Sequence, residues 1–224
     1  MVQKLEGHVE VFKVGLSLQL APGVEGLIQH LLDNRTKLFL DYKYYDIPET
    51  LTKAVSQAAR RGVTFLTIHG SGSLIRAAVK GRGESPMKLF TVTVLTSWDK
   101  GDLLEMGYSN HTVEQLVLFR AKMALEAGCD GVIASGREAQ GIRGLSDKLL
   151  VITPGIRPDG YGEDDQKRRT TPADAILAGA DYLVIGRPIT GAADPVEATE
   201  KIVAEMQTAF DQLDRGLEIS QNGG

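Results

Sequence analysis

The sequence contains very little cysteine, because Cys129 is the single one among 224 residues. One cysteine excludes a disulfide framework within the chain and a metal site built from several thiolates. Cys129 lies between a helical pattern and an apolar segment. We therefore expect a buried, unreactive thiol.

Long apolar runs and an excess of basic residues are missing as well. No run approaches the roughly 18 residues that a membrane-spanning helix needs, and residues 1–6 are too polar for the core of a signal peptide. The net charge of −4 argues against a nucleic-acid-binding protein, since such proteins carry basic patches. We expect a globular protein of the cytoplasm with neither a membrane nor a nucleic acid as partner.

Seven short apolar segments alternate with helical patterns along the chain, which is typical of a parallel sheet packed against helices. Most of the segments end in polar or glycine-rich residues, as strands do at the active rim of a β/α barrel. The predicted strands are residues 9–14, 37–40, 64–68, 89–95, 131–134, 149–152 and 182–185. The sequence thus predicts one α/β barrel domain over residues 1–216 and a disordered tail at residues 217–224.

Charged residues gather directly after the second predicted strand. Asp41 and Lys43 are two residues apart, so on a strand their side chains point to the same face. Asp46 follows where the chain bends, and Pro48 suits the first turn of a helix. Strand ends are where α/β proteins usually build their sites. Spacing alone leaves open a purely structural role, in which Asp41 and Lys43 form an ion pair at the sheet edge and Asp46 caps the helix.

Two later segments also carry candidate ligand contacts. Residues 158–171 form a long polar segment that contains Gln166 and follows Arg157, and we interpret it as a lid rather than a plain solvated loop. Gly186 and Arg187 follow the last strand, where backbone N–H groups and a guanidinium together form an anion site. The alternative for these two residues is a surface arginine after a turn glycine.

Four motifs occur in an order that points to a family. They are FKVG at residues 12–15, DYKYYDIPET at residues 41–50, TPGIRP at residues 153–158 and IGRPI at residues 185–189. Together they resemble the orotidine 5′-phosphate decarboxylase family, whose signature reads D-x-K-x-x-D-I-P-x-T. The resemblance implies a (β/α)8 barrel of the TIM type, usually a homodimer with shared active sites, that forms UMP without a metal or an organic cofactor.

The resemblance also implies a role for each matching residue. Lys43 would donate a proton to C6 of the pyrimidine as carbon dioxide leaves, with Asp41 beside it and Lys13 orienting that aspartate. Asp46 would reach into the partner subunit's site. Substrate contacts would come from Thr50 across the dimer and from Thr96, Arg157, Gln166, Gly186 and Arg187. The chemistry agrees, because a fixed ammonium group stabilises the charge that develops at C6.

The chain departs from this family at its start. The family's barrel begins with a strand that ends in a ribose-binding aspartate, whereas residues 1–8 contain no apolar strand. The predicted barrel therefore lacks its first strand, which would expose two sheet edges with unpaired backbone groups. Our preferred explanation is a sequence truncated at its start. A chain that folds as given, with weak activity, is the alternative.

Two other functions stay open. Related barrels use the D-x-K-x-x-D frame with magnesium for lyase chemistry on sugar phosphates, and sensitivity to EDTA would favour that function. A UMP-binding barrel with little or no activity is the second, and it would leave orotidine 5′-phosphate unchanged. The continuation through Ile47, Pro48 and Thr50, together with Gln166, favours the nucleotide decarboxylase.

Overall fold

A single sheet of seven parallel strands, paired in sequence order, forms the centre of the protein. The computed structural model describes the backbone of residues 1–162 and 168–222 and the side chains of residues 1–162 and 168–215. The strands are β1 (Val11–Gly15), β2 (Lys37–Tyr44), β3 (Phe65–Ile68), β4 (Lys88–Val92), β5 (Gly131–Ile133), β6 (Leu150–Thr153) and β7 (Tyr182–Leu183). All seven strands predicted from the sequence are confirmed, although several differ in length.

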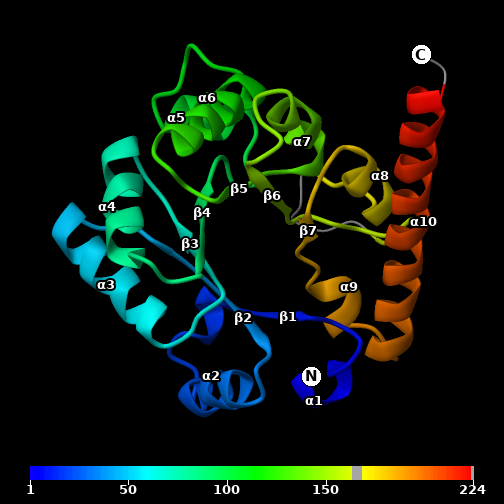
Figure 1. Ribbon diagram of the computed structural model, residues 1–224, viewed down its shortest axis with the longest axis horizontal. Helices are drawn as coiled ribbons and strands as arrows, with labels where there is room; N and C mark the ends of the chain where they lie inside the picture. The colour runs from blue at the N-terminus through cyan, green and yellow to red at the C-terminus, as the bar shows by residue number, and fades with distance from the viewer. Residues whose placement is uncertain (163–167, 223–224) are drawn as a thin grey trace.

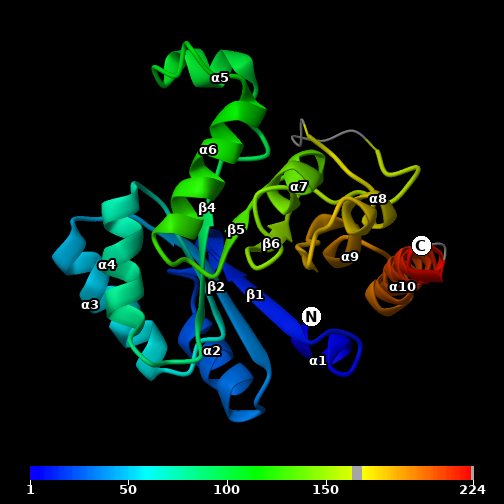
Figure 2. The ribbon, with the colours of Figure 1, turned by 45° about the horizontal axis from the view of Figure 1, so that its top comes forward.

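Helices connect the strands, and α3, α4, α6, α7 and α8 follow one another around the outside of the curved sheet (Figure 1). The helices are α1 (Val2–Leu5), α2 (Val24–Asp33), α3 (Pro48–Arg60), α4 (Gly72–Arg82), α5 (Lys100–Glu105), α6 (Val113–Glu126), α7 (Gly136–Arg143), α8 (Pro172–Leu177), α9 (Arg187–Thr190) and α10 (Pro195–Asn222). The α5 helix stands away from the sheet (Figure 2). In the described part of the chain, no helix is both long and apolar enough to cross a membrane.

The sheet curls like part of a TIM-type barrel and stays open between β7 and β1, since no ladder between these strands occurs within the described residues. The prediction of a barrel that lacks one strand is therefore confirmed. An apolar cluster of Leu5, Ile189 and Ile202 packs against Phe12 of β1 and against Ile185, which follows β7. Side chains from both ends of the sheet thus share this small core.

The two faces of the sheet are buried in different ways. Leu38 and Leu40 of β2 belong to the large core between the strands and the helices, whereas Phe39 belongs to a second cluster, on the other face of the sheet. Phe65 lies edge-on to Phe39 and to Phe90, with ring centroids 6.0 and 5.3 Å apart. Each buried phenylalanine contributes about 1.5–3 kcal/mol to stability. The face that carries Phe39, which is the inner face of the curved sheet, is therefore apolar up to the strand ends.

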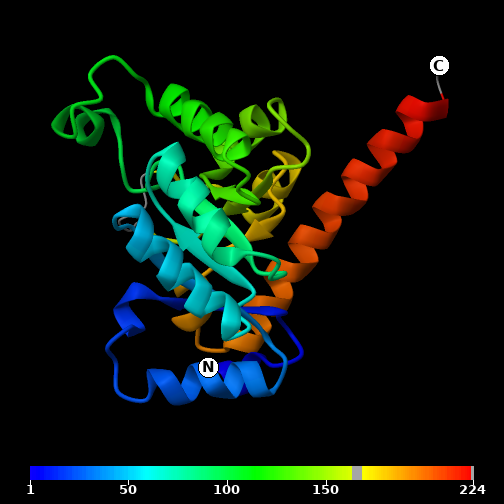
Figure 3. The ribbon, with the colours of Figure 1, turned by 60° about the vertical axis from the view of Figure 1, so that its left-hand side comes forward.

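Helix ends follow local sequence signals. Thr112 begins α6 with a capping box, in which its hydroxyl accepts from the Gln115 N–H while the Gln115 side chain accepts from the Thr112 N–H. Gly128 and Gly179 follow α6 and α8 with φ values of 78° and 99°, which favour glycine. The last helix, α10, projects from the rest of the protein (Figure 3). As described, it extends to Asn222, within the segment expected from the sequence to be disordered.

Candidate active site

Two lysines from neighbouring strands share one carboxylate at the carboxyl ends of β1 and β2. The Nζ atom of Lys43 lies 2.8 Å from Oδ1 of Asp41, and Nζ of Lys13 lies 3.1 Å from Oδ2. Strand register explains the meeting, because Asp41 pairs with Gly15, two residues beyond Lys13. An added Cβ at Gly15 would come within 3.0 Å of the Lys13 ammonium, so the glycine leaves room for it.

The backbone at Lys43 differs from the regular strand that the sequence predicts. The β2 strand does not end at Leu40 but continues to Tyr44, and its register against β3 shifts between these two residues. Lys43 has a φ of 51°, in the left-handed region that costs a non-glycine residue about 1–3 kcal/mol. Asp41 and Lys43 do meet, but this irregular conformation, and not simple alternation along a strand, brings them together.

Thr67 of β3 connects this pair and was missed in the sequence analysis. Its hydroxyl accepts a hydrogen bond from the Lys43 N–H at 2.9 Å and donates to Oδ1 of Asp41 at 3.0 Å. The side chain is fully buried. The sequence does carry one signal for it, because Thr67 is a polar residue within the otherwise apolar segment of residues 65–68.

The two ammonium groups determine the ionisation of Asp41. Burial raises the pKa of this carboxyl, but the charges of Lys13 and Lys43 outweigh burial and hold the pKa below its ordinary value. Nearby, burial lowers the pKa of His69, and the positive charges of Arg120 and Lys43 add to that effect. His69 packs edge-on against Tyr45, with ring centroids 5.8 Å apart. The site therefore holds one carboxylate, that of Asp41, between the ammonium groups of Lys13 and Lys43.

A cavity of about 200 Å³ opens beside the charged group. Its walls include Asp41, Lys43, Thr96 and Pro154 together with the apolar side chains of Val92 and Ile133. Sites for small ligands usually measure about 300–1,000 Å³. This cavity therefore suits a ring-sized part of a ligand, held between an apolar wall and an ammonium group.

Arg157, Gly186 and Arg187, which were also predicted to contact the substrate, are not among the described residues that line the cavity. Arg157 is buried, donates to its neighbouring Ile156 carbonyl at 2.7 Å and lies over the Tyr161 ring, 5.3 Å from its centroid. Gly186 and Arg187 are exposed where β7 leads into α9. Gln166 falls outside the described residues, so its predicted place in a lid stays a prediction.

Asp46 and Thr50 are exposed at the start of α3 and are not among the described residues that line the cavity. Oδ1 of Asp46 accepts a hydrogen bond from the Ile47 N–H at 2.7 Å. Among the described residues, neither side chain forms an ion pair or a hydrogen bond with Lys13, Asp41 or Lys43.

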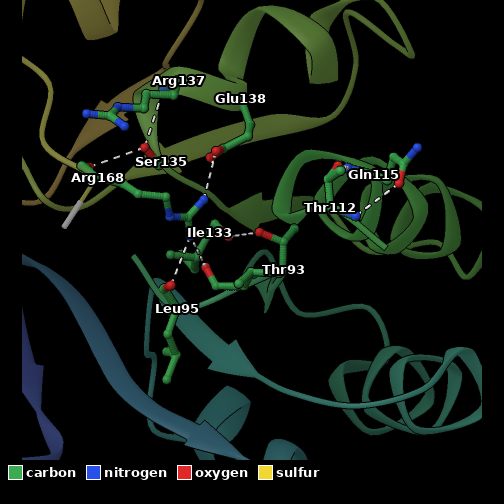
Figure 4. Close-up of polar contacts among 10 residues, drawn as sticks. Thr93, Leu95, Thr112, Gln115, Ile133, Ser135, Arg137, Glu138 and Arg168 are labelled. Carbon is green, nitrogen blue, oxygen red and sulfur yellow. Dashed lines mark hydrogen bonds and ion pairs between the residues drawn. The ribbon is translucent and has the colours of Figure 1, made fainter. Parts of the chain in front are cut away.

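A buried ion pair holds the chain next to the cavity wall (Figure 4). Nη1 of Arg168 lies 2.7 Å from Oε1 of Glu138 on α7, and both side chains are at most 8% exposed. Nη2 of Arg168 donates to the carbonyls of Leu95 at 2.9 Å and Val94 at 3.1 Å, directly before Thr96. Burial raises the pKa of Glu138, and the Arg168 charge opposes this rise. This network was also missed, since it joins residues far apart in the sequence.

The family of the chain follows from comparison with known proteins. The sequence profile described as the orotidine 5′-phosphate decarboxylase / HUMPS family matches residues 1–202. The chain belongs to this family. The resemblance found in the four sequence motifs is thereby confirmed.

Individual relatives of this decarboxylase family agree. The orotidine 5′-phosphate decarboxylase of Nitrobacter winogradskyi is 50% identical over 211 residues, covering 94% of this chain and 87% of the relative. The enzyme of the same name from Methylococcus capsulatus is 44% identical over 212 residues, covering 94% and 86%. A crystal structure of orotidine 5′-phosphate decarboxylase from Lactobacillus acidophilus matches with a TM-score of 0.73 and 37% identity, over 87% of this chain and 85% of that one.

Proposed function

We propose that this chain converts orotidine 5′-phosphate to UMP and carbon dioxide, with Lys43 as the proton donor to C6. The observation that carries the proposal is the Lys13, Asp41 and Lys43 group beside a ring-sized cavity. It occurs in a member of the family in which a relative with 50% sequence identity bears the decarboxylase name. The reaction also needs a site that stabilises negative charge on a carbon atom, and an ammonium group at the cavity wall supplies one.

The proposed step balances in protons and electrons. The bond between C6 and the carboxylate breaks, carbon dioxide leaves, and the electron pair stays on C6. The Lys43 ammonium stabilises that pair and transfers one proton to C6, after which the neutral amine takes a proton from water. Asp41 is held by Lys13 and orients Lys43, so the ammonium is in place before the charge develops.

The contacts of Asp41 favour this chemistry over the magnesium-dependent lyase reaction. Oδ1 already accepts from the Lys43 ammonium and the Thr67 hydroxyl, and Oδ2 lies beside the Lys13 ammonium. A metal ion at this carboxylate would have to displace a cation from it and would lie beside two positive charges. We therefore propose a reaction that needs no metal.

The phosphate of the substrate is proposed to bind where β7 leads into α9. There Gly186 offers an exposed backbone and Arg187 a guanidinium, which suits a dianion. Gln166 and Arg157 are proposed to support the phosphate side, and Thr96, on the cavity wall, the base. Binding energy from the phosphate can then lower the barrier at the distant C6.

We further propose a cytoplasmic homodimer in which Asp46 and Thr50 complete the site of the partner subunit. Both are exposed in the single chain, and Asp46 is flanked by the apolar side chains of Tyr45 and Ile47, which are 70% and 66% exposed. Apolar residues this exposed on both sides of Asp46 suit a surface that another subunit covers. The loop that carries Asp46 would then contribute to the cavity of the partner subunit.

The ultraviolet absorbance of orotidine 5′-phosphate, followed with the purified protein, tests the proposed function. We expect loss of substrate and formation of UMP at the same rate with and without EDTA. Activity that EDTA abolishes would support the magnesium-dependent lyase class instead. Binding of UMP without any turnover of orotidine 5′-phosphate would support the binding barrel.

A further inference from the structure

The backbone of Lys43 is held in an unusual conformation that its own residue type does not favour. Lys43 and Arg35 are the two non-glycine residues with positive φ in the described part of the chain, and Lys43 has a φ of 51°. Strand pairing does not support it, because the register of β2 against β3 shifts between Leu40 and Tyr44. Some other contact must therefore hold the residue in place.

The Thr67 hydroxyl supplies that contact. It accepts from the Lys43 N–H at 2.9 Å, which occupies the backbone donor that the irregular strand leaves free of the ladder. Its own proton has two acceptors in reach, Oδ1 of Asp41 at 3.0 Å and the Leu40 carbonyl at 3.5 Å. The carboxylate is nearer and carries a charge, so it takes the stronger bond.

Thr67 thereby joins the backbone of one charged residue to the side chain of the other. Oδ1 of Asp41 accepts both the Thr67 hydroxyl and the Lys43 ammonium, the latter at 2.8 Å. Thr67 is fully buried, so water does not compete for these bonds. A methyl group in place of the hydroxyl would release the Lys43 N–H and one bond to the carboxylate together.

We propose that Thr67 is a positioning residue, which sets the conformation of Lys43 and the orientation of Asp41 for proton transfer at C6. This inference rests on the proposed decarboxylase function. Thr67 does not line the described cavity and would act only through Asp41 and Lys43. Small displacements of a reacting group cost an enzyme turnover while leaving most substrate contacts intact.

Two variants of Thr67 test the proposal. Thr67→Val keeps the volume and β-branching but removes the hydroxyl, and we expect kcat to fall about 10- to 100-fold with KM changed much less. Thr67→Ser keeps the hydroxyl and should recover most of the wild-type kcat. Failure of the serine variant to recover activity, although it folds, would overturn the proposal.

Thr93→Val is the matched control. Thr93 is also buried, and its hydroxyl donates to the Ile133 carbonyl at 2.7 Å, as Figure 4 shows, so its loss removes one buried hydrogen bond without touching Asp41 or Lys43. We expect this variant to lose stability but to keep its kcat. A kcat that falls equally in Thr67→Val and Thr93→Val would assign Thr67 a merely structural role.

A titration separates this proposal from the proposed function. The charged groups that face Asp41 are Lys13 of β1 and Lys43 of β2, and both remain in Thr67→Val. Loss of a hydrogen bond to the carboxylate should raise the pKa of Asp41, measured by NMR with carbon-13-labelled aspartate and assigned with Asp41→Asn. An inactive wild-type protein would contradict the decarboxylase function, whereas an unchanged Asp41 titration would contradict the role of Thr67.

Discussion

At the scale of single residues, the site depends on how charges are compensated. Asp41 is 16% exposed and contacts two ammonium groups, whereas Glu138 is buried against one guanidinium. The first carboxyl has a lowered pKa and the second a raised one, because burial is outweighed in one case and not in the other. Asp41 therefore affects how stability depends on pH, whereas the Glu138 pair affects the free energy of unfolding.

The pH dependence of stability follows from the lowered pKa of Asp41. A depressed pKa contributes stability at pH values above the unfolded-state pKa of about 3.9, and this contribution is lost as pH falls through the folded-state pKa. We expect urea unfolding of the wild-type protein to show this acid loss and Asp41→Asn to show less of it. Asp211→Asn, on the surface of α10, is the control and should behave like wild type.

The Arg168–Glu138 pair should matter more for stability than an exposed pair. Arg168→Met leaves the Glu138 carboxylate buried without its partner, and we expect a loss of about 3–5 kcal/mol in unfolding free energy. Lys53→Ala removes one partner of the exposed Glu49–Lys53 pair on α3 and should change stability by less than about 1 kcal/mol. Equal effects in urea unfolding would contradict the burial argument.

At the scale of helices and strands, close approach between α3 and α4 depends on one glycine. An added Cβ at Gly81 of α4 would lie 2.3 Å from the Thr52 carbonyl oxygen on α3. The single proton of the Thr52 hydroxyl has two acceptors in reach, the carbonyls of Pro48 at 2.8 Å and Ala77 at 3.0 Å. Since α3 begins at Pro48, two residues after Asp46, this contact also supports the loop that carries Asp46.

We expect Gly81→Ala to destabilise the protein by about 1–3 kcal/mol or more, because the backbone of α3 at Thr52 would have to move. Gly26→Ala on α2 is the matched control, since a Cβ there meets nothing within 4 Å. Alanine is the better helix former, so this change should stabilise the protein by up to about 1 kcal/mol. Thermal unfolding of the two variants measures both effects, and a loss in Gly26→Ala similar to that in Gly81→Ala would contradict the account.

The elements were largely predictable from the sequence, but their irregularities were not. Apolar segments reveal buried strands, and parallel pairing brings their carboxyl ends to one edge, so the meeting of Lys13, Asp41 and Lys43 could be expected. The left-handed backbone conformation of Lys43 and its hydrogen bond to Thr67 depend on the register of β2 against β3. Local patterns carry no information about that register, nor about the pairing of Arg168 with Glu138.

At the scale of the whole molecule, the proposed dimer makes each active site a composite. Asp46 and Lys43 lie three residues apart in sequence, yet Lys43 lines the cavity of its own chain while Asp46 is exposed. If Asp46 serves the partner's cavity, then Lys43→Ala and Asp46→Ala damage different sites of a mixed dimer. One of its two sites then contains both wild-type residues.

We therefore expect mixing of the two inactive variants, after dissociation and reassociation, to restore activity at one site in each mixed dimer. Each variant alone should stay inactive under the same treatment, which controls for refolding. Sedimentation velocity should show dimers for wild type and variants. Dimers that form yet show no recovery of activity would contradict the shared site.

The role of Lys43 is tested most directly by comparing Lys43→Ala with wild type in two assays, turnover of orotidine 5′-phosphate and calorimetric binding of UMP. We expect kcat to fall by at least about 10⁴-fold, since proton donation and charge stabilisation are both lost. Binding of UMP should persist, because the proposed phosphate contacts of Gly186 and Arg187 remain. A Lys43→Ala protein that still decarboxylates the substrate within tenfold of the wild-type rate would contradict the account.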